Sequence, residues 1–363
     1  MNIVIRTDAS IEIGTGHVMR CLTLAKQLKR YGAEVTFFCR SLDGNIMSYL
    51  DEQGISAIVL PSINGNEADI TWTKENWLLD AEQTMAFIKD FDHKVDLLIV
   101  DHYGLDHRWE HKLRPFTEHI MVIDDLADRR HECDLLLDQN YYLNMEKRYQ
   151  GLIPNNCVQM LGPDHVLLRD EFLQVASKQR ERTGKIRSIL VFFGGSDPTG
   201  ETLKTIKALK DLQRLDIAIH VVVGESNPKR DEIEKICAKM PNVYFYCQVS
   251  NMAELMGKAD LAIGAGGATT WERCFLGLPT MTIVIADNQL EATMLLHEEG
   301  VIVYIGESEQ VTSEMIKRNL LDLIKNQAKV KCLSENSRMI VNSQKVKENI
   351  VLQTIQRVIG GLA

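Results

Sequence analysis

Short apolar runs alternate with helical stretches along this chain, and the alternation occurs twice. The first series of runs comprises residues 3–5, 34–38, 57–60, 95–100, 120–123 and 135–137. The second series comprises residues 188–193, 217–223, 243–246, 259–264 and 281–285. Buried strands separated by helices are typical of parallel sheets that are covered on both faces. The sequence therefore predicts two doubly wound α/β halves, each with its ligand edge at the carboxyl ends of the strands.

The chain length also favours two domains, because 363 residues exceed a typical single hydrophobic core. The pattern loosens between residues 151 and 163, and a fresh strand follows Lys185. We therefore place the N-terminal domain at 1–165, the C-terminal domain at 166–340 and a closing helix at 341–363. This closing helix either packs back on the first domain or lies in solvent.

Composition limits the partners that we expect. The net charge of -9 disfavours nucleic acid and anionic membranes. The 8 cysteines include no Cys-x-x-Cys pair, so we expect reduced core thiols without a disulfide or a metal role. The sequence opens directly on a strand, and no apolar stretch approaches the length of a membrane span. We expect a cytoplasmic protein.

A glycine-rich turn lies between the first strand and the first helix. Gly14 and Gly16 allow backbone N–H groups to surround an anion, and the positive end of the helix points to the same place. His17 falls in the first helical turn, where the dipole disfavours imidazolium and leaves the ring able to accept a proton. Arg20 shares its face, and Asp8 is a candidate to orient the ring. A plain tight turn also explains two glycines, but the combination favours a ligand loop.

Polar residues follow three other strands and are therefore expected at the ligand edges. Tyr103 offers a hydroxyl that binds or orients a substrate group. Asp124 and Asp125 resemble a metal pair, but no further ligand lies at a recognisable spacing, and we expect no metal. Asn288 and Gln289 open a helix at a strand end of the second half. A polar residue at such a position also serves as a simple helix cap.

The second half repeats the strand, glycine turn and helix at residues 194–198. Gly195 lies in the turn, Ser196 or Asp197 caps the helix, and Pro198 suits the first helical position. We therefore expect a second anion-binding helix start at this point.

A sharper motif follows the strand at 259–264. Gly266 and Gly267 precede a helix that begins near Thr269 and Thr270, whose N–H groups are expected to meet a phosphate. Glu272 lies one turn inside, where a carboxylate can accept both hydrogen bonds of a ribose diol. The alternative is a plain turn followed by a surface charge.

These motifs together resemble the PseG family of UDP-sugar hydrolases in pseudaminic acid biosynthesis. The resemblance spans roughly residues 1 to 305 and rests on the motifs at 6–22, 101–104, 194–197, 264–279 and 288–289. It implies a GT-B-like fold, in which two Rossmann-like doubly wound domains face a cleft and a helical C-terminal tail follows. The N-terminal domain is then the sugar and catalytic side, and the C-terminal domain is the UDP-binding side.

The resemblance also implies a reaction. UDP is released from UDP-2,4-diacetamido-2,4,6-trideoxy-β-L-altropyranose with inversion at the anomeric carbon, without a metal or another cofactor. The family base matches His17, and the residues around the sugar match Tyr103 and Asn288. A single base that activates water opposite the leaving group is sufficient for inversion, and helix N-termini support the charge that develops on UDP.

Three alternatives remain open at this stage. A GT-B glycosyltransferase resembling the MurG-type enzymes would release UDP slowly until an acceptor is added. A non-catalytic UDP-sugar-binding protein would release none, and a UDP-sugar 2-epimerase would exchange the proton at C2. We expect UDP-sugar as the only partner and a monomer.

Overall fold

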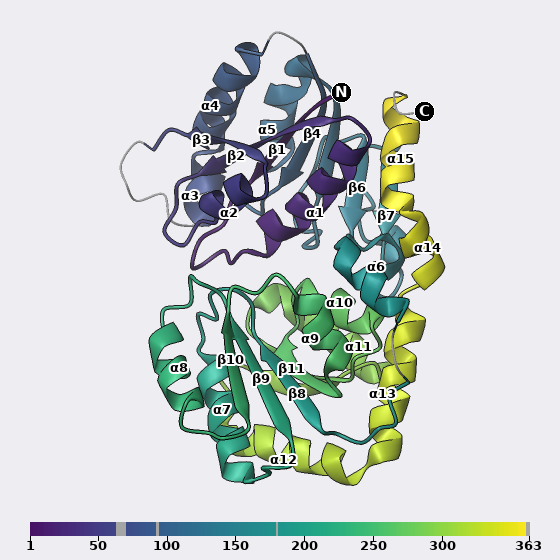
Figure 1. The fold of residues 1–363 in the computed structure, drawn as a ribbon. Coiled ribbons are helices and arrows are strands. Elements are labelled where there is room, and N and C mark those ends of the chain that lie inside the picture. Colours follow the sequence, from purple (N-terminus) through teal and green to yellow (C-terminus); the bar gives the residue numbers. More distant parts are fainter. Residues whose placement is uncertain (63–69, 92–93, 179–180, 361–363) are drawn as a thin grey trace. The chain divides into compact units, whose positions relative to one another are not determined.

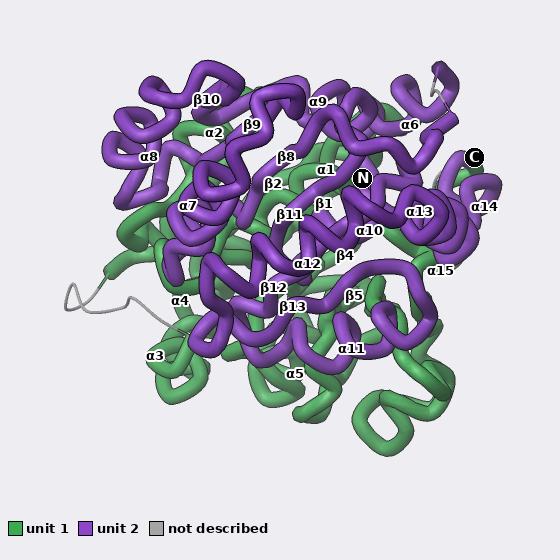
Figure 2. The backbone as a smooth tube through the Cα atoms, turned by 90° about the horizontal axis from the view of Figure 1, so that it is seen from below, with its two compact units in different colours: residues 1–167, 348–363 green, residues 168–347 purple. Residues whose placement is uncertain are grey.

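The computed structural model describes residues 1–62, 70–91, 94–178 and 181–360, which form two compact units (Figure 2). Unit 1 runs from Met1 to Leu167 and resumes at Glu348, and unit 2 runs from Leu168 to Lys347. Each unit is built on one parallel sheet, as the repeated alternation predicts. The two-domain α/β class is therefore confirmed.

The sheet of unit 1 has the order β3-β2-β1-β4-β5-β6-β7, and its strands are parallel (Figure 1). The strands are β1 (Asn2–Thr7), β2 (Glu34–Arg40), β3 (Ser56–Leu60), β4 (Val95–Asp101), β5 (Thr117–Ile123), β6 (Leu135–Asp138) and β7 (Val158–Leu161). The helices are α1 (Gly16–Arg30), α2 (Met47–Glu52), α3 (Ile70–Glu75), α4 (Trp77–Lys89), α5 (His107–Leu113) and α15 (Ile350–Ile359), with short 3-10 turns at Arg114–Phe116, Met145–Lys147 and Pro163–His165.

Alternate residues of β1 enter two different cores, because side chains along a strand point to opposite faces. Ile3 and Ile5 pack with α1 and α15 on one face. Val4 packs with α4 and α5 on the other face. Both faces of the sheet are thus covered by helices, which is the doubly wound arrangement that continuous apolar strands favour.

Unit 2 repeats this construction with the strand order β10-β9-β8-β11-β12-β13. The strands are β8 (Ser188–Phe192), β9 (Ala218–Val223), β10 (Val243–Cys247), β11 (Leu261–Ala265), β12 (Thr280–Val284) and β13 (Val303–Glu307). The helices are α6 (Asp170–Ala176), α7 (Glu201–Leu212), α8 (Arg230–Cys237), α9 (Met252–Lys258), α10 (Thr269–Phe275), α11 (Leu290–Glu298), α12 (Ser313–Lys325), α13 (Gln327–Ile340) and α14 (Ser343–Glu348), with a 3-10 turn at Asp287–Gln289. The main core lies between the sheet and α7, α8 and α12.

The C-terminal region is helical, but the predicted closing helix is divided into α14 and α15. Asn349 separates them because its backbone is left-handed, with φ of 52°, and its side chain caps α15 by accepting from the Leu352 N–H. Val351, Leu352 and Ile355 then enter the core that contains α1. Of the two alternatives for the chain end, packing on the N-terminal domain is the one observed (Figure 1).

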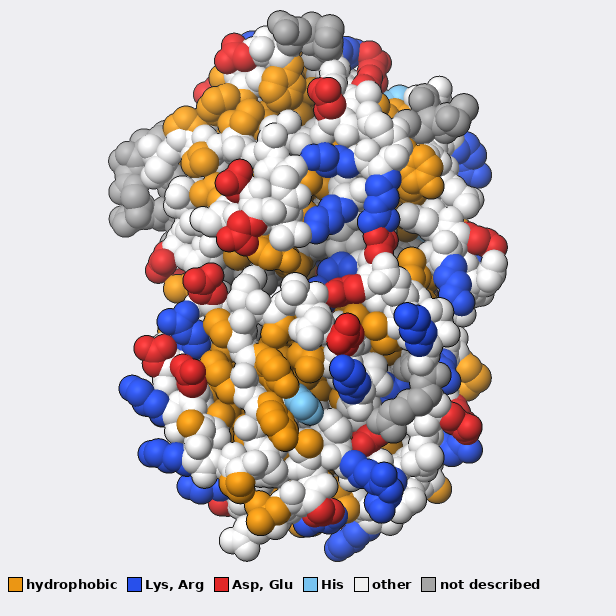
Figure 3. Space-filling model, in the orientation of Figure 1, with side chains coloured by type: hydrophobic (Ala, Val, Ile, Leu, Met, Phe, Trp, Pro, Cys, Tyr) orange, Lys and Arg blue, Asp and Glu red, His pale blue; other side chains and the backbone are white. Residues whose placement is uncertain are grey.

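Charged side chains of both signs are interspersed over the face of the molecule that Figure 3 shows. No helix within the described ranges combines the length and the apolar character that crossing a membrane requires.

Candidate active site

The turn between β1 and α1 uses its own backbone groups to fix its shape. Gly14 has a φ of 77°, which favours glycine, and its N–H donates to the Ser10 carbonyl at 2.9 Å. The Ile13 N–H donates to the Ser10 hydroxyl at 2.9 Å. The Gly14 N–H is therefore engaged inside the turn rather than presented to an anion, contrary to the sequence prediction. Gly16 is the first residue of α1.

His17 lies in the first turn of α1, and its side chain is buried against the end of β4. Its Nδ1 is 2.5 Å from Oδ1 of Asp101, the last residue of β4. Arg20 holds the same carboxylate with two hydrogen bonds of 2.7 Å, from Nε to Oδ2 and from Nη2 to Oδ1. Burial would raise the pKa of Asp101, but Arg20 and His17 hold it far below its usual range. Arg20 Nη2 also lies 3.2 Å from Nδ1, but its shorter contact is with Asp101. We therefore assign the tautomer in which Nδ1–H donates to the ionised Asp101, and this tautomer places the lone pair on Nε2.

Tyr103 and Asp125 complete this cluster. The Tyr103 hydroxyl donates to Asp125 Oδ1 at 2.6 Å, and Arg20 Nη1 donates to Asp125 Oδ2 at 3.1 Å. The Tyr103 ring meets His17 edge to face, with ring centroids 4.5 Å apart. Burial, reinforced by Asp125, raises the pKa of Tyr103 well above its usual value, so the side chain stays a neutral phenol.

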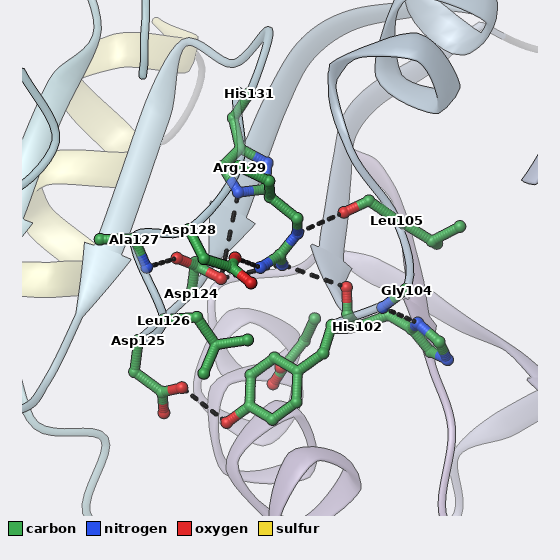
Figure 4. Close-up of polar contacts among 12 residues, drawn as sticks. His102, Gly104, Leu105, Asp124, Asp125, Leu126, Ala127, Asp128, Arg129 and His131 are labelled. Carbon is green, nitrogen blue, oxygen red and sulfur yellow. Dashed lines mark hydrogen bonds and ion pairs between the residues drawn. The ribbon is translucent and has the colours of Figure 1, made fainter. Parts of the chain in front are cut away.

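The loop after β5, which carries Asp125, is fastened to the loop after β4, which carries Tyr103 (Figure 4). Asp124 accepts from the Ala127 N–H at 2.9 Å and pairs with Arg129 at 2.8 Å. Arg129 in turn donates to the Leu105 carbonyl at 2.8 Å. Asp124 thus contacts groups of its own loop and the Tyr149 hydroxyl, which lies 3.1 Å from its Oδ2, whereas Asp125 contacts Tyr103. Adjacent in sequence, the two carboxylates have separate sets of partners.

Asp8 does not orient His17, so that interpretation is wrong. Its carboxylate is fully buried, 2.7 Å from Arg6 Nη1 and 3.2 Å from His102 Nε2, and it accepts from the Arg40 N–H at 2.7 Å. Alternation along the strand explains this difference, because Asp8 and Arg6 follow the parity of Val4, on the face opposite α1. The same partners occupy the Asp8 carboxylate, so the structure does not support the predicted contact of Asp8 with substrate.

Asp138, the last residue of β6, is expected to make the stability of unit 1 depend on pH. Burial raises the pKa of its carboxyl to about 7, although the Asn140 N–H and the Tyr149 hydroxyl donate to it at 3.0 Å. In the unfolded chain the pKa of the Asp138 carboxyl is about 4. Between about pH 4 and 7 this carboxyl is therefore protonated in the folded protein and ionised in the unfolded chain. The contribution of protonated Asp138 to the free energy of unfolding is fully present below about pH 4 and is lost as the pH rises through about 7.

We therefore expect Asp138→Asn to become more stable relative to the wild type by on the order of 2 kcal/mol between pH 5 and pH 8. Urea unfolding at several pH values measures this difference. Asp51→Asn, at an exposed position of α2, is the matched control and is expected to show no such trend. A constant difference between Asp138→Asn and the wild type would contradict the prediction.

The start of α7 differs from the prediction for the second glycine turn. The helix begins at Glu201 rather than at Pro198, with Gly200 as its N-cap. Asp197 does act as a cap, since its carboxylate accepts from the N–H groups of Glu201 and Thr202 at 2.9 Å each. An internal carboxylate therefore occupies two N–H groups of this helix start, and the binding of an anion by the turn before it stays a prediction. Gly195 and Ser196 precede it, and Ser196 is buried.

Glu272, on α10, has one oxygen engaged and one buried oxygen without a hydrogen-bond partner among the described residues. Oε1 accepts from Arg169 Nη2 at 2.9 Å and from Nε at 3.0 Å. Oε2 is the unpartnered oxygen. A buried carboxylate oxygen without a hydrogen-bond partner is costly, so a ligand hydroxyl that reached Oε2 would be favoured, and the ribose interpretation stays a prediction.

Gln289 joins two loops at the carboxyl edge of the unit 2 sheet. Its Oε1 accepts from the N–H groups of Gly266 and Ile285 at 3.2 Å each. A Cβ atom at Gly266 would lie 2.4 Å from Thr293 Oγ1, so this close packing requires glycine. Gly267 and Asn288 belong to the same two loops. The predicted residues of unit 2 that gather at this edge are Gly266, Gly267, Thr269, Thr270, Glu272, Asn288 and Gln289.

Comparison with known proteins gives these sites a context. Residues 189–351 match the glycosyltransferase family 28 C-terminal domain. An uncharacterized protein of Methanocaldococcus jannaschii is 28% identical over 298 residues, which are 80% of this chain but only 57% of that protein. The UDP-2,4-diacetamido-2,4,6-trideoxy-β-L-altropyranose hydrolase of Campylobacter jejuni is 28% identical over 83% of this chain and 97% of its own length. The resemblance to the PseG family is confirmed.

The fold agrees with this likeness to PseG-type hydrolases. The crystal structure of MurG from Acinetobacter baumannii aligns with a TM-score of 0.63 at 17% identity, over 98% of this chain and 100% of that chain. At this identity the alignment supports the fold alone. The GT-B-like class, with two parallel-sheet domains and a helical C-terminal region, is therefore confirmed.

Proposed function

We propose that this protein is a UDP-sugar hydrolase that releases UDP from UDP-2,4-diacetamido-2,4,6-trideoxy-β-L-altropyranose with inversion at the anomeric carbon. The likeness to the Campylobacter jejuni hydrolase over 83% of the chain supports this substrate. The contact between His17 and Asp101 carries the chemical part of the proposal, because it leaves one imidazole nitrogen free to act as a base. The released sugar would then be an intermediate of pseudaminic acid biosynthesis.

In the proposed reaction, His17 Nε2 takes a proton from water as the water oxygen attacks the anomeric carbon. The bond from that carbon to the phosphate oxygen breaks, and its electron pair leaves with UDP. Asp101 keeps Nδ1 protonated and stabilises the imidazolium that forms. UDP is a good leaving group, so its phosphates need electrostatic support more than a proton. The His17 proton then returns to solvent.

We propose complementary binding roles for the other residues. Tyr103 donates its proton to Asp125, so its oxygen is an acceptor for an amide N–H or a hydroxyl of the sugar. Arg20 is committed to two carboxylates, and we propose that it supports the site by positioning Asp101 and Asp125. In unit 2, we propose that a ribose hydroxyl of UDP donates to Glu272 Oε2, the buried oxygen that has no hydrogen-bond partner among the described residues.

A glycosyltransferase is the second candidate, and the match to the glycosyltransferase family 28 C-terminal domain favours it. Both reactions use a UDP-sugar donor, so the nucleotide-binding features of unit 2 do not distinguish a hydrolase from a transferase. The attacking group does, because a hydrolase uses water and a transferase requires an acceptor alcohol.

UDP release in water with EDTA tests the proposal. We expect the purified chain to release UDP from the diacetamido-altrose nucleotide without any added alcohol, and NMR of the first product to give the inverted anomer. Binding of the UDP-sugar with release only after addition of an acceptor would establish the transferase instead. Binding without any release would indicate a binding protein, and solvent deuterium at C2 of the product would reveal an epimerase route.

A further inference from the structure

Arg273, on α10, is a buried cation whose partners are all neutral. Its exposed fraction is 2%. Nη2 donates to the Ala265 carbonyl at 2.6 Å and to the Thr270 hydroxyl at 2.9 Å, and Nη1 donates to the Thr269 hydroxyl at 3.4 Å. Across the described part of the chain, no carboxylate forms a salt bridge with this guanidinium.

An isolated buried charge is costly, since neutral dipoles replace only part of its hydration. Burial accordingly lowers the pKa of Arg273 to about 10, although Glu272 nearby opposes this shift. The side chain is still cationic at neutral pH. Its Nε has no hydrogen-bond partner among the described residues. Unit 2 therefore contains a positive charge that a bound anion would compensate.

The guanidinium lies at the carboxyl end of β11, directly under the glycine loop. A Cβ atom at Gly264 would lie 2.7 Å from Arg273 Nη1 and 2.4 Å from the Phe192 carbonyl oxygen, so only glycine leaves room for this side chain. Gly266, two residues further along, donates its N–H to Gln289 Oε1. The buried charge is thus placed beneath the same loop for which the sequence predicts a phosphate contact.

The threonine hydroxyls relay this charge toward the loop surface. A hydroxyl that accepts from a guanidinium keeps its own proton for donation to another group. Thr270 is buried, whereas Thr269 is partly exposed at the start of α10. The Thr269 proton is therefore available to an anion at the loop, and the cation behind the oxygen makes that proton a stronger donor.

We propose that Arg273 is a positioning residue for the diphosphate of the UDP-sugar, acting from beneath the loop through the Thr269 hydroxyl. This inference rests on the proposed function, because it assumes that unit 2 binds UDP. It separates two parts of the ligand. The positive charge of Arg273 is expected to strengthen binding of the diphosphate and to have little effect on binding of the uridine.

Calorimetric titration of the full chain with UDP and with uridine tests this inference. We expect Arg273→Met to bind UDP about 10- to 100-fold more weakly, because a charge-assisted contact is lost, while uridine affinity changes by less than about threefold. Thr269→Val is expected to weaken UDP binding in the same selective manner. The double variant should be no weaker than Arg273→Met, since both changes remove one relay.

Arg182→Met is the matched control, because Arg182 is another buried arginine of unit 2 and donates to the carbonyls of Met256, Ala259 and Leu276. It should leave the ratio of UDP to uridine affinity unchanged. Equal losses for UDP and uridine in Arg273→Met, or no loss, would overturn the inference. If Arg273→Met does not fold, an unchanged UDP affinity in Thr269→Val overturns it. Failure of the wild type to bind UDP overturns the proposed function as well.

Discussion

Replacement of His17 by glutamine is expected to lower kcat for UDP release by about 10²- to 10⁴-fold, with a change in KM of less than about threefold. Glutamine preserves a polar side chain that can contact Asp101, but it provides no basic nitrogen for the water proton. The loss therefore falls on the transition state rather than on binding. Initial rates of UDP release over a range of substrate concentrations separate kcat from KM.

His111→Gln is the matched control for this substitution. His111 lies on α5 in the same unit, pairs with Glu132 and is exposed. We expect its variant to keep the rate of the wild type. Near-normal turnover in a folded His17→Gln protein would exclude the imidazole as the base, even if the chain proved to be a hydrolase.

The fold could be predicted from the sequence because the strands are buried on both faces. Runs such as 97–100 are apolar at every position, and this continuous pattern is typical of a sheet that helices cover on both sides. The corner that carries His17 was predictable for the same reason, since it follows the first strand directly. Local sequence determines both features.

The partners of His17 were not predictable from local sequence. Asp8 is close to His17 in the chain, yet Asp101 contacts it from a separation of 84 residues. The register explains the outcome, because Thr7 pairs with Asp101 and both follow the parity of Ile5 on the face of α1. This parity was readable only after β1 and β4 were known to be neighbours. Asp125 was considered only as half of an apparent metal pair, because its contact with Tyr103 joins two separate loops.

Caps and turns account for the remaining differences. The predicted start of the helix at Pro198 assumed that proline occupies the first helical position. Asp197 instead spans the turn and reaches the N–H groups of Glu201 and Thr202, which delays the helix by three residues.

Replacement of Asp80 by leucine is expected to destabilise unit 1 by about 3–5 kcal/mol. Asp80 is fully buried on α4 and accepts from Arg6 Nη2 at 2.7 Å, from Arg40 Nη2 at 2.8 Å and from Trp109 Nε1 at 2.9 Å. Burial opposes its ionisation, but the two guanidinium groups hold the pKa of Asp80 below its usual value. Its removal takes a shared carboxylate from two buried guanidinium groups, of which Arg6 keeps Asp8 as an anionic partner.

Urea unfolding followed by tryptophan fluorescence measures the effect, because the Trp109 indole contacts Asp80 directly. Asp90→Leu, at the exposed C-cap of the same helix, controls for the loss of a carboxylate and for helix propensity. A loss below about 1 kcal/mol in Asp80→Leu would mean that the cluster relaxes or admits water. The expected loss would show that the ion pairs around Arg6 stabilise unit 1, which also carries His17.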